Sequence, residues 1–261
     1  APQIERQGTI FFKEMSEVAT EVSGKVISVE FEEGDRVKAG HILVRLDDSL
    51  LTKELNSKRA MYQQHLTDLD EAKARYDRTK QLIEDEVATP QEYDKIRFEV
   101  ESNTHQVAAT KADVDRMETL IEKNVIHAPF DGIVLDRRTE LGEWKASGAA
   151  VAMLARENIF DLVAEVPQEN LEWIAPGTTV PIVAGARELS REVITVIAKG
   201  DIATRTFPVK VRVLNEGDLY EGMSALVRLP AGKPTPCLFV PRDAVLNQDG
   251  EYVVFTEEAG T

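Results

Sequence analysis

The sequence is poor in cysteine and contains no long apolar run. Its only cysteine, Cys237, excludes an internal disulfide, and it also excludes a zinc ribbon or an iron–sulfur cluster built within one chain. No apolar run approaches the roughly 18 residues that a membrane-spanning helix needs. Residues 1–5 lack the basic and apolar regions of a signal peptide. We therefore expect the chain as given to be soluble, as a mature or trimmed form would be.

Positive charge and aromatic side chains are also scarce. The 261 residues contain 31 Lys and Arg against 46 Asp and Glu, which gives a formal net charge of −15. Because nucleic-acid binding requires clustered Lys and Arg, this balance argues against a nucleic-acid partner. The length predicts roughly two ordinary domains. An aromatic content of 6% predicts that their hydrophobic cores contain few aromatic side chains.

The sequence lacks the local motifs of common enzymes. Its histidines are scattered, and it contains no HExxH, GxSxG or phosphate-cradling GxxxxGK pattern. The methionines are too widely spread for a soft-metal site. We therefore predict no catalytic residues, no resident metal and no cofactor. The four histidines are His41, His65, His105 and His127.

One pattern occurs twice, in residues 22–46 and again in residues 130–154. Three glycines of the first copy recur 108 residues later in the second copy, without a gap. Each copy is typical of a short strand, a glycine turn and a second short strand, in which glycine supplies the positive φ of the turn. Two such halves related by a pseudo-twofold would bury both apolar faces in one small barrel. The glycine pairs are Gly24 and Gly132, Gly34 and Gly142, and Gly40 and Gly148.

The segment between the two copies predicts a helical hairpin. It has no glycine from residue 60 to residue 131, and its apolar residues recur at the heptad spacing of a coiled coil. The stretch from Thr89 to Glu92 offers a Thr N-cap, a Pro at the first helical position and a Glu at the third, which marks the start of the second helix. Two equal arms of about 30 residues would be about 50 Å long.

Pairing the two arms about Ala88 places Ile83 opposite Tyr93 and Tyr76 opposite Val100. Four polar residues occupy or flank the apolar seam of this pairing. They can fix the register of the two helices, or they can mark a surface for a second helical partner, and we favour the first interpretation. The four are Lys58, His65, Asn103 and Thr110.

From residue 158 onward the pattern changes to short alternating strands with glycine turns, which predicts a small antiparallel barrel. Residues 230–236 have the composition of a linker, and Asp249-Gly250 is a hairpin turn signal. The chain stops after one further strand. We expect the missing partner of that strand to come from residues 1 to about 12.

The two half-motifs resemble the halves of a biotinyl/lipoyl domain, separated by a hairpin where that domain carries its modified lysine on a tight turn. This arrangement resembles the periplasmic adaptor proteins, or membrane fusion proteins, of bacterial tripartite efflux pumps. It is most similar to the adaptors of RND-type transporters, which are HlyD-like. At the hairpin tip that family carries an Arg, a Leu four residues on and a Ser seven beyond. Here Arg78, Leu82 and Thr89 hold that spacing, with Thr in place of Ser.

Other stretches extend the resemblance over nearly the whole chain. The sequence EVATPQEYD, after Leu82, looks like the family's tip. Residues 201–213 and 219–229 resemble its β-barrel signature, and residues 239–255 resemble the start of its membrane-proximal domain.

The resemblance implies an elongated, multi-domain α+β protein. It consists of a coiled-coil hairpin inserted in a split lipoyl-like (barrel-sandwich hybrid) domain, a small β-barrel and part of a β-rich membrane-proximal domain. We assign these in that order to residues 49–123, to 21–48 with 124–156, to 13–20 with 157–231, and to 1–12 with 232–261.

The implied function is non-enzymatic. Such a protein links an inner-membrane transporter to an outer-membrane channel for the export of drugs or other small molecules, and it self-associates into a ring. The implied location is the periplasm, with attachment to the inner membrane through an anchor outside this chain. Arg78, Leu82 and Thr89 would dock the channel. The acidic run at residues 84–86 could dock on basic residues of a partner or simply solubilise the helix end, and both interpretations stay open.

Two alternatives remain. An adaptor of an ATP-driven type I secretion or macrolide-type exporter would share this fold. A carrier domain of a biotin- or lipoate-dependent enzyme would need a lysine on a hairpin turn. After Leu46 the chain instead enters a helical pattern in which Lys53 is read as an exposed flank of the coiled coil.

Overall fold

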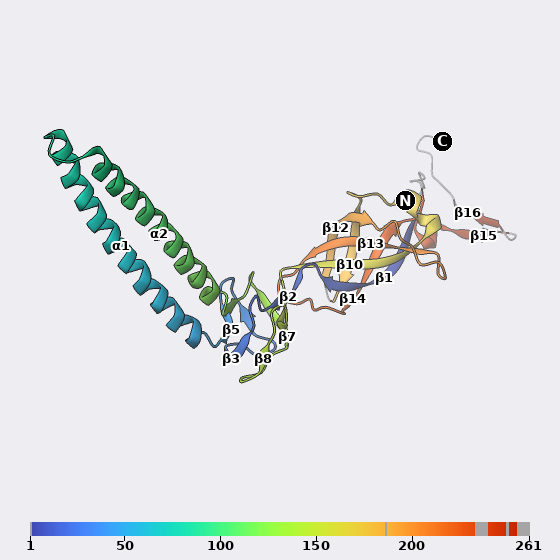
Figure 1. The fold of residues 1–261 in the computed structure, drawn as a ribbon. Coiled ribbons are helices and arrows are strands. Elements are labelled where there is room, and N and C mark those ends of the chain that lie inside the picture. Colours follow the sequence, from blue (N-terminus) through green and yellow to red (C-terminus); the bar gives the residue numbers. More distant parts are fainter. Residues whose placement is uncertain (1, 186, 233–239, 249–250, 255–261) are drawn as a thin grey trace. The chain divides into compact units, whose positions relative to one another are not determined.

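The computed structural model describes residues 2–185, 187–232, 240–248 and 251–254. The chain divides into two compact units. One is Phe12–Ile159, and the other combines Ala1–Phe11 with Phe160–Thr261 (Figure 1).

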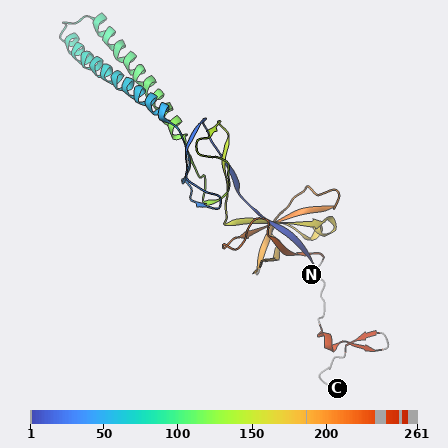
Figure 2. The ribbon, with the colours of Figure 1, turned by 90° about the horizontal axis from the view of Figure 1, so that it is seen from below.

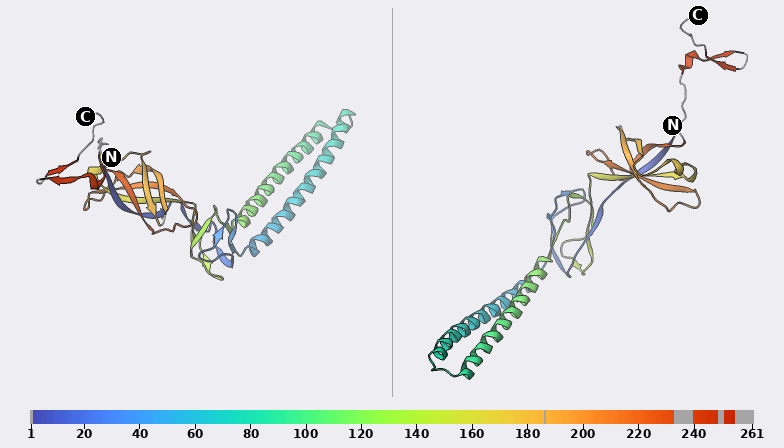
Figure 3. Two further views of the ribbon diagram at one scale, coloured as in Figure 1. Left: turned by 180° about the vertical axis from the view of Figure 1, so that it is seen from behind. Right: turned by 90° about the horizontal axis from the view of Figure 1, so that it is seen from above.

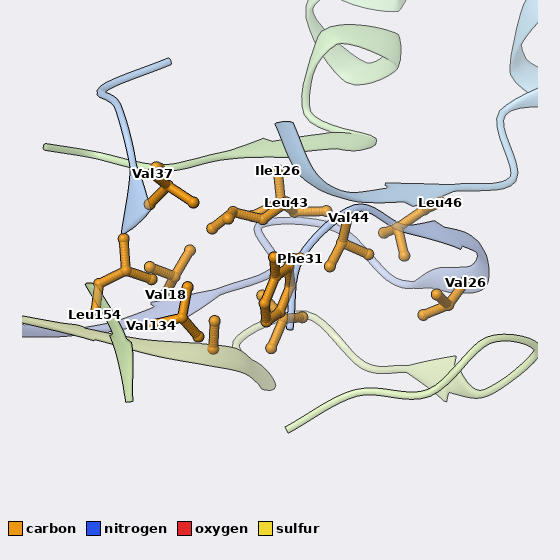
Figure 4. Packing of buried hydrophobic residues seen from close by; sticks show 13 residues of the cluster. Val18, Val26, Phe31, Val37, Leu43, Val44, Leu46, Ile126, Val134 and Leu154 are labelled. Atoms are coloured by element: carbon orange, nitrogen blue, oxygen red, sulfur yellow. The ribbon is translucent and has the colours of Figure 1, made fainter. Parts of the chain in front are cut away.

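The first unit contains two four-stranded sheets, with strand orders β2-β9-β7-β4 and β6-β5-β3-β8. Apolar side chains of both sequence repeats point into one shared interior, including Val26 and Leu46 from the first copy and Val134 and Leu154 from the second (Figure 4). The strands are β2 (Met15–Ala19), β3 (Gly24–Val29), β4 (Arg36–Val37), β5 (Ile42–Leu46), β6 (Val125–His127), β7 (Gly132–Arg137), β8 (Trp144–Lys145) and β9 (Ala150–Ala155). The split lipoyl-like domain is therefore confirmed.

The register of the strands obeys the same 108-residue offset as the sequence. Val26 pairs with Leu46 in β3 and β5, and Val134 pairs with Leu154 in β7 and β9. Both pairs are followed by a bulge at the equivalent place. Because strand pairing is repeated at this detail, the two halves are related by a pseudo-twofold.

The repeat begins earlier than the sequence pattern suggested. Strand β2 pairs with β9 as β6 pairs with β5, so residues 17–19 are equivalent to residues 125–127. Residues 13–20 were assigned to the β-barrel, and that assignment is wrong for β2. Its backbone groups complete the edge of a lipoyl-like sheet, as those of β6 do in the other sheet.

The six repeat glycines serve two different purposes. Four of them have a positive φ, between 81° and 91°, as the turn interpretation predicts. Gly24 and Gly132 do not, so the expectation of a positive φ is wrong for these two. They allow close packing instead, because a Cβ added at Gly132 would lie 2.3 Å from the Ala155 carbonyl oxygen. The four positive-φ glycines are Gly34, Gly40, Gly142 and Gly148.

Two long helices are inserted between β5 and β6 and form the predicted hairpin. They are α1 (Ser49–Glu84) and α2 (Pro90–Glu122), and they run side by side (Figure 2). Leu55, Val114 and Met117 form a buried cluster near the base, while Leu69 and Ala72 are buried further out.

The polar seam residues bond across the two helices. Lys58 Nζ donates to Asp113 Oδ2 at 3.0 Å, Asn103 Nδ2 donates to the Asp68 carbonyl at 3.3 Å, and His65 Nδ1 lies 3.4 Å from Thr110 Oγ1. Each contact joins positions that must face each other, so these residues support the register interpretation.

The second unit contains a closed six-stranded barrel of order β1-β10-β13-β12-β11-β14 (Figure 3). Its interior is filled by alternate side chains such as Ile10, Leu162 and Ile182, each fully buried. The strands are β1 (Gln3–Phe12), β10 (Ile159–Pro167), β11 (Thr179–Ala184), β12 (Arg187–Val196), β13 (Thr206–Leu214) and β14 (Ser224–Pro230), with the 3-10 helix η1 (Gln168–Trp173) after β10.

The placement of residues 1–12 in the membrane-proximal domain is wrong for the strand they form. Strand β1 pairs with β14 from Gln3 opposite Pro230 to Thr9 opposite Ser224. Without β1, the edges of β10 and β14 would be open, and closing the barrel satisfies their backbone groups.

The remaining described residues form a short 3-10 helix, η2 (Arg242–Ala244), and an antiparallel pair, β15 (Leu246–Gln248) and β16 (Glu251–Val253). Most of the predicted linker, Cys237, the Asp249-Gly250 turn and residues 255–261 lie outside the described residues. Among the helices described, none is both long and apolar enough to cross a membrane.

Candidate functional site at the hairpin tip

The turn between α1 and α2 has a defined backbone structure. After the C-cap Asp85, Glu86 adopts a left-handed conformation with φ 56°. The Val87 N–H donates to the Leu82 carbonyl at 2.8 Å, and the Glu86 N–H donates to the Ile83 carbonyl at 3.2 Å. This is the Schellman arrangement, which satisfies the last carbonyls of a helix. The end of α1 is thus held in one geometry even though no glycine is present.

The start of α2 is a complete capping box. The Glu92 N–H donates to Thr89 Oγ1 at 3.3 Å, and the Thr89 N–H donates to Glu92 Oε2 at 2.9 Å. Thr89 Oγ1 also donates to the same carboxylate at 2.8 Å. These hydrogen bonds, from the Thr89 backbone first and its side chain second, lower the pKa of Glu92. The N-cap function predicted for Thr89 is therefore confirmed.

The structure brings the three predicted docking residues to the tip. Arg78 and Leu82 lie one turn apart on α1, and Leu82 keeps 45% of its surface exposed, so it does not fill the hairpin core. Arg78 and Thr89 are exposed. Within the described part of the chain, Arg78 forms no ion pair or side-chain hydrogen bond. The charge of Arg78 and part of the Leu82 side chain are thus available to a partner.

An open groove of about 400 Å³ lies beside these residues, and it was not predicted from the sequence. Val87 and Leu82 contribute to it from the turn and from α1, and Ile96 contributes from α2. Val87 is 71% exposed and sits on the left-handed turn that places it there. The sequence does contain an indication of this groove, because Val87 is an apolar residue between the acidic run at residues 84–86 and the capping box. The groove is lined by Thr79, Leu82, Val87, Ala88, Glu92, Lys95 and Ile96.

Below the tip, the two helices are joined by a tyrosine pair. The hydroxyl oxygens of Tyr76 and Tyr93 are 2.6 Å apart, with ring centroids 5.4 Å apart. The hydrogen bond with Tyr76 raises the pKa of Tyr93. The expected pairing, with Tyr93 opposite Ile83 and Tyr76 opposite Val100, did not include this contact between the two hydroxyls. An ion pair between Arg75 and Glu99 lies next to the tyrosines.

This geometry suits recognition by contact. The tip presents the guanidinium of Arg78, a partly exposed leucine and an apolar groove. The end of α1 and the start of α2 are both capped, so these features are held in one geometry. Lys53, which a carrier domain would need on a strand turn, instead lies exposed in the second turn of α1. The chain after β5 therefore continues into a helix at the place where a carrier would present its modified residue.

Comparisons with known proteins agree with this fold. The family model described as CzcB-like, barrel-sandwich hybrid domain matches residues 14–156, which is more than half of the chain. The model described as CusB-like, beta-barrel domain matches residues 162–233. The first match includes strand β2 and so agrees with its place in the lipoyl-like sheets.

Relatives of known name are similar along most of the chain. The multidrug resistance protein MdtA of Escherichia coli K12 is 24% identical over 259 residues, covering 94% of this chain and 62% of MdtA. MdtA of Klebsiella pneumoniae is also 24% identical, covering 94% of this chain and 63% of that protein. This chain thus spans somewhat less than two thirds of the length of these relatives.

Solved structures share the fold at lower identity. MacA from Actinobacillus actinomycetemcomitans superposes with a TM-score of 0.72 at 16% identity, covering 87% of this chain and 78% of MacA. The membrane fusion protein Spr0693 from Streptococcus pneumoniae R6 superposes with a TM-score of 0.69 at 13% identity, covering 88% of this chain and all of that one.

Proposed function

The chain belongs to the CzcB-like barrel-sandwich hybrid family, and we propose that it acts as a non-enzymatic periplasmic adaptor of an efflux pump. In this proposal it joins an inner-membrane transporter to an outer-membrane channel, and the hairpin tip docks on the channel. The observation that carries the proposal is the tip itself. An exposed Arg78 and a 45% exposed Leu82 lie on the last turns of α1, and the turn that follows them is held by caps at the end of α1 and at the start of α2.

The chemistry of the tip favours a protein partner over a small molecule. The groove beside Leu82 is open, and its lining combines apolar residues of both helices with the charged Glu92 and Lys95. A guanidinium beside an exposed leucine provides a charge-assisted donor and an apolar contact, and these together fit a helical hairpin of another chain. Thr89 contributes by holding the start of α2, since its hydroxyl is engaged with Glu92.

The relatives support the transport class. MdtA is named as a multidrug resistance protein, so we propose that the cargo of the pump is a drug or another small molecule and that the transporter is of the RND type. We further propose that the whole protein is attached to the inner membrane and that several copies form a ring. An adaptor of an ATP-driven exporter is the alternative, and co-purification of the full-length protein with its membrane partners decides between them.

The decisive experiment is a charge reversal at Arg78. We expect Arg78→Asp to abolish binding of the outer-membrane channel in a pull-down and to abolish drug resistance in cells. The melting temperature should shift by less than about 2 °C, because a surface substitution changes stability by about 0.5 kcal/mol or less. Arg116→Asp is the matched control, because Arg116 is an exposed arginine of α2 far from the tip. If Arg78→Asp binds the channel as well as the wild type does, the tip does not dock it.

A second experiment addresses the carrier alternative. The intact mass of the protein after expression with biotin and lipoate should equal the sequence mass. An added biotinyl or lipoyl group would contradict the adaptor proposal, whatever the tip variants do.

A further inference from the structure

Two positive side chains border the groove at the hairpin tip, although the protein as a whole carries a net charge of −15. Lys95 lines the groove from α2, and Arg78 stands on α1 directly before Thr79, which lines it from the other helix. These two cations outnumber the single carboxylate of the lining, which belongs to Glu92. The charge at the groove is therefore opposite in sign to that of the whole protein. We call the lining residues the tip groove, namely Thr79, Leu82, Val87, Ala88, Glu92, Lys95 and Ile96.

Lys95 is exposed, and among the residues that the structure describes its ammonium group has no ion-pair or hydrogen-bond partner. On a helix, a lysine can pair with a carboxylate three or four residues away. Both carboxylates at that spacing are engaged with other groups. Glu92 accepts hydrogen bonds from the Thr89 N–H at 2.9 Å and from Thr89 Oγ1 at 2.8 Å, and Glu99 forms an ion pair with Arg75. The charge of Lys95 is therefore left to a partner, as that of Arg78 is.

The floor of the tip groove is apolar and partly open to water. Val87 is 71% exposed, Leu82 is 45% exposed, and Ile96 is half-buried. Val87 follows Glu86, whose left-handed backbone turns the chain at this point. Because the removal of apolar surface from water is favourable, a partner that covers these side chains gains free energy. The floor therefore favours contact with an apolar side chain, at a place that lies between two cations.

An ion pair crosses the hairpin directly below the tip groove. Arg75 lies four residues before Thr79 on α1, and Glu99 lies four residues after Lys95 on α2. Residues four apart share one face of a helix, so this ion pair lies on the same side of the hairpin as the groove. It joins the two helices on the side away from the turn. An occupant of the tip groove therefore approaches from the tip, as the proposed docking requires.

We propose that the tip groove receives an apolar side chain of the outer-membrane channel that is flanked by a carboxylate, and that Lys95 is the specificity-determining residue that selects this carboxylate. A channel that presents an acidic residue there gains a charge-assisted contact. A channel that presents Lys or Arg places two like charges together, which disfavours the wrong partner. The inference rests on the proposed docking of the tip, and it adds the chemistry that the docked partner must carry.

The charge of Lys95 is tested with the full-length protein and the channel that co-purifies with it. Lys95→Glu should weaken the binding of that channel at least about 10-fold, because it turns an attraction into a repulsion. Lys95→Arg keeps the charge and should bind within about 3-fold of the wild type. Lys80→Glu is the matched control, because Lys80 is an exposed lysine of α1 near the tip that does not line the tip groove. It changes the net charge by the same amount and should bind like the wild type.

The apolar floor is tested separately at Val87, which lies outside both helices. Val87→Ser removes apolar surface from the tip groove and should weaken channel binding about 10-fold, whereas Val87→Ile keeps the floor apolar and should bind like the wild type. Far-UV circular dichroism should be the same for all variants of Lys95 and Val87. This measurement separates a lost contact from a hairpin that has not folded.

Compensating substitutions in the channel identify the residue that faces Lys95. Channel variants selected for restored drug resistance in Lys95→Glu cells should replace an Asp or Glu by Lys or Arg, and they should bind the wild-type protein more weakly. The inference is overturned if Lys95→Glu binds like the wild type, if Lys80→Glu loses as much affinity, or if no restoring substitution changes an acidic residue. Loss of binding in Arg78→Asp but not in Lys95→Glu would overturn this inference alone. Normal binding by Arg78→Asp would overturn the docking of the tip as well.

Discussion

Gly24 and Gly132 occupy equivalent positions in the two halves of the lipoyl-like domain. Gly24 pairs with Lys145, and Gly132 pairs with Val37. The second pair therefore repeats the first, because Gly132 follows Gly24 by 108 residues and Lys145 follows Val37 by the same offset. Their surroundings differ nonetheless. A Cβ at Gly132 would lie 2.3 Å from the backbone oxygen of Ala155, whereas a Cβ at Gly24 would lie 3.1 Å from the Leu46 side chain.

We therefore expect Gly132→Ala to destabilise the protein by about 2–3 kcal/mol, because the backbone it meets cannot move without disturbing β9. Gly24→Ala is the matched control and should cost less, about 1 kcal/mol, since its nearest contact is Leu46 Cβ at 3.1 Å, which needs a shift of only a few tenths of an ångström. Urea denaturation of both variants measures the difference. Equal losses for the two would mean that the close approach at Ala155 is not what requires glycine.

The turn of the hairpin predicts a stabilising substitution. Glu86 has a φ of 56°, which costs a residue with a side chain about 1 kcal/mol relative to glycine. Glu86→Gly should raise the free energy of unfolding of the hairpin by about 1 kcal/mol, measured by far-UV circular dichroism in urea. Glu84→Gly, at the last helical residue, should lower it by about 0.5–1 kcal/mol. A destabilising effect of Glu86→Gly would argue against the Schellman turn.

The capping box predicts a pH dependence at the start of α2. Hydrogen bonds from Thr89 lower the pKa of Glu92 in the folded state. Their contribution to stability is therefore complete above the ordinary value of 4.5 and is lost as the pH falls through the lowered pKa. Carboxyl resonances followed by NMR should show Glu92 titrating below the ordinary glutamate value of 4.5, and Thr89→Ala should move the Glu92 pKa back up.

Two substitutions of Thr89 test its role as a helix cap separately from any direct contact with the channel. Thr89→Ala should cost about 1 kcal/mol through the lost cap. Thr89→Ser keeps the hydroxyl and should leave both the melting temperature and channel binding unchanged. Loss of channel binding in the serine variant would show that the threonine methyl group itself contacts the partner.

The length of the hairpin makes a prediction about export. Deleting residues 62–68 and 108–114 removes one heptad from each helix and shortens the hairpin by about 10 Å. His65 and Thr110, which face each other, are removed together. The barrel and lipoyl-like domain should fold, and export should fail because the tip no longer reaches the channel.

The control for this experiment removes residues 62–68 alone. That deletion shifts the register of α1 against α2 and should lower the helical circular dichroism signal, which the paired deletion preserves. Normal drug resistance with the paired deletion would show that reach does not matter.

Much of the fold could be predicted because its signals are local or periodic. The heptads of α1 and α2, the cap at Thr89 and the 108-residue repeat depend on residues close together in the chain or on a constant offset. The Tyr76–Tyr93 contact could not be predicted from heptads alone. It depends on how far one helix slides along the other, and polar cross-links such as Lys58–Asp113 set that distance.

Part of the candidate site could be predicted from the sequence, and part of it could not. Arg78, Leu82 and Thr89 were found because they match a motif of the family that the sequence resembles, and the structure places them at the tip. Val87 and the groove beside it were missed, because their exposure follows from the left-handed backbone at Glu86, a residue with no sequence preference for that conformation. Docking of a channel at this tip stays a prediction.

The sequence by itself determined the repeat, the two helices and their caps, since helix periodicity and turn chemistry act within a few residues. Only the tertiary structure decided where the first strands belong. Strand β1 closes the barrel against β14, and β2 completes a lipoyl-like sheet against β9, although the two strands are adjacent in the chain. A short strand pairs with whichever open edge matches its alternation and register, and that edge lies more than 130 residues away in both cases.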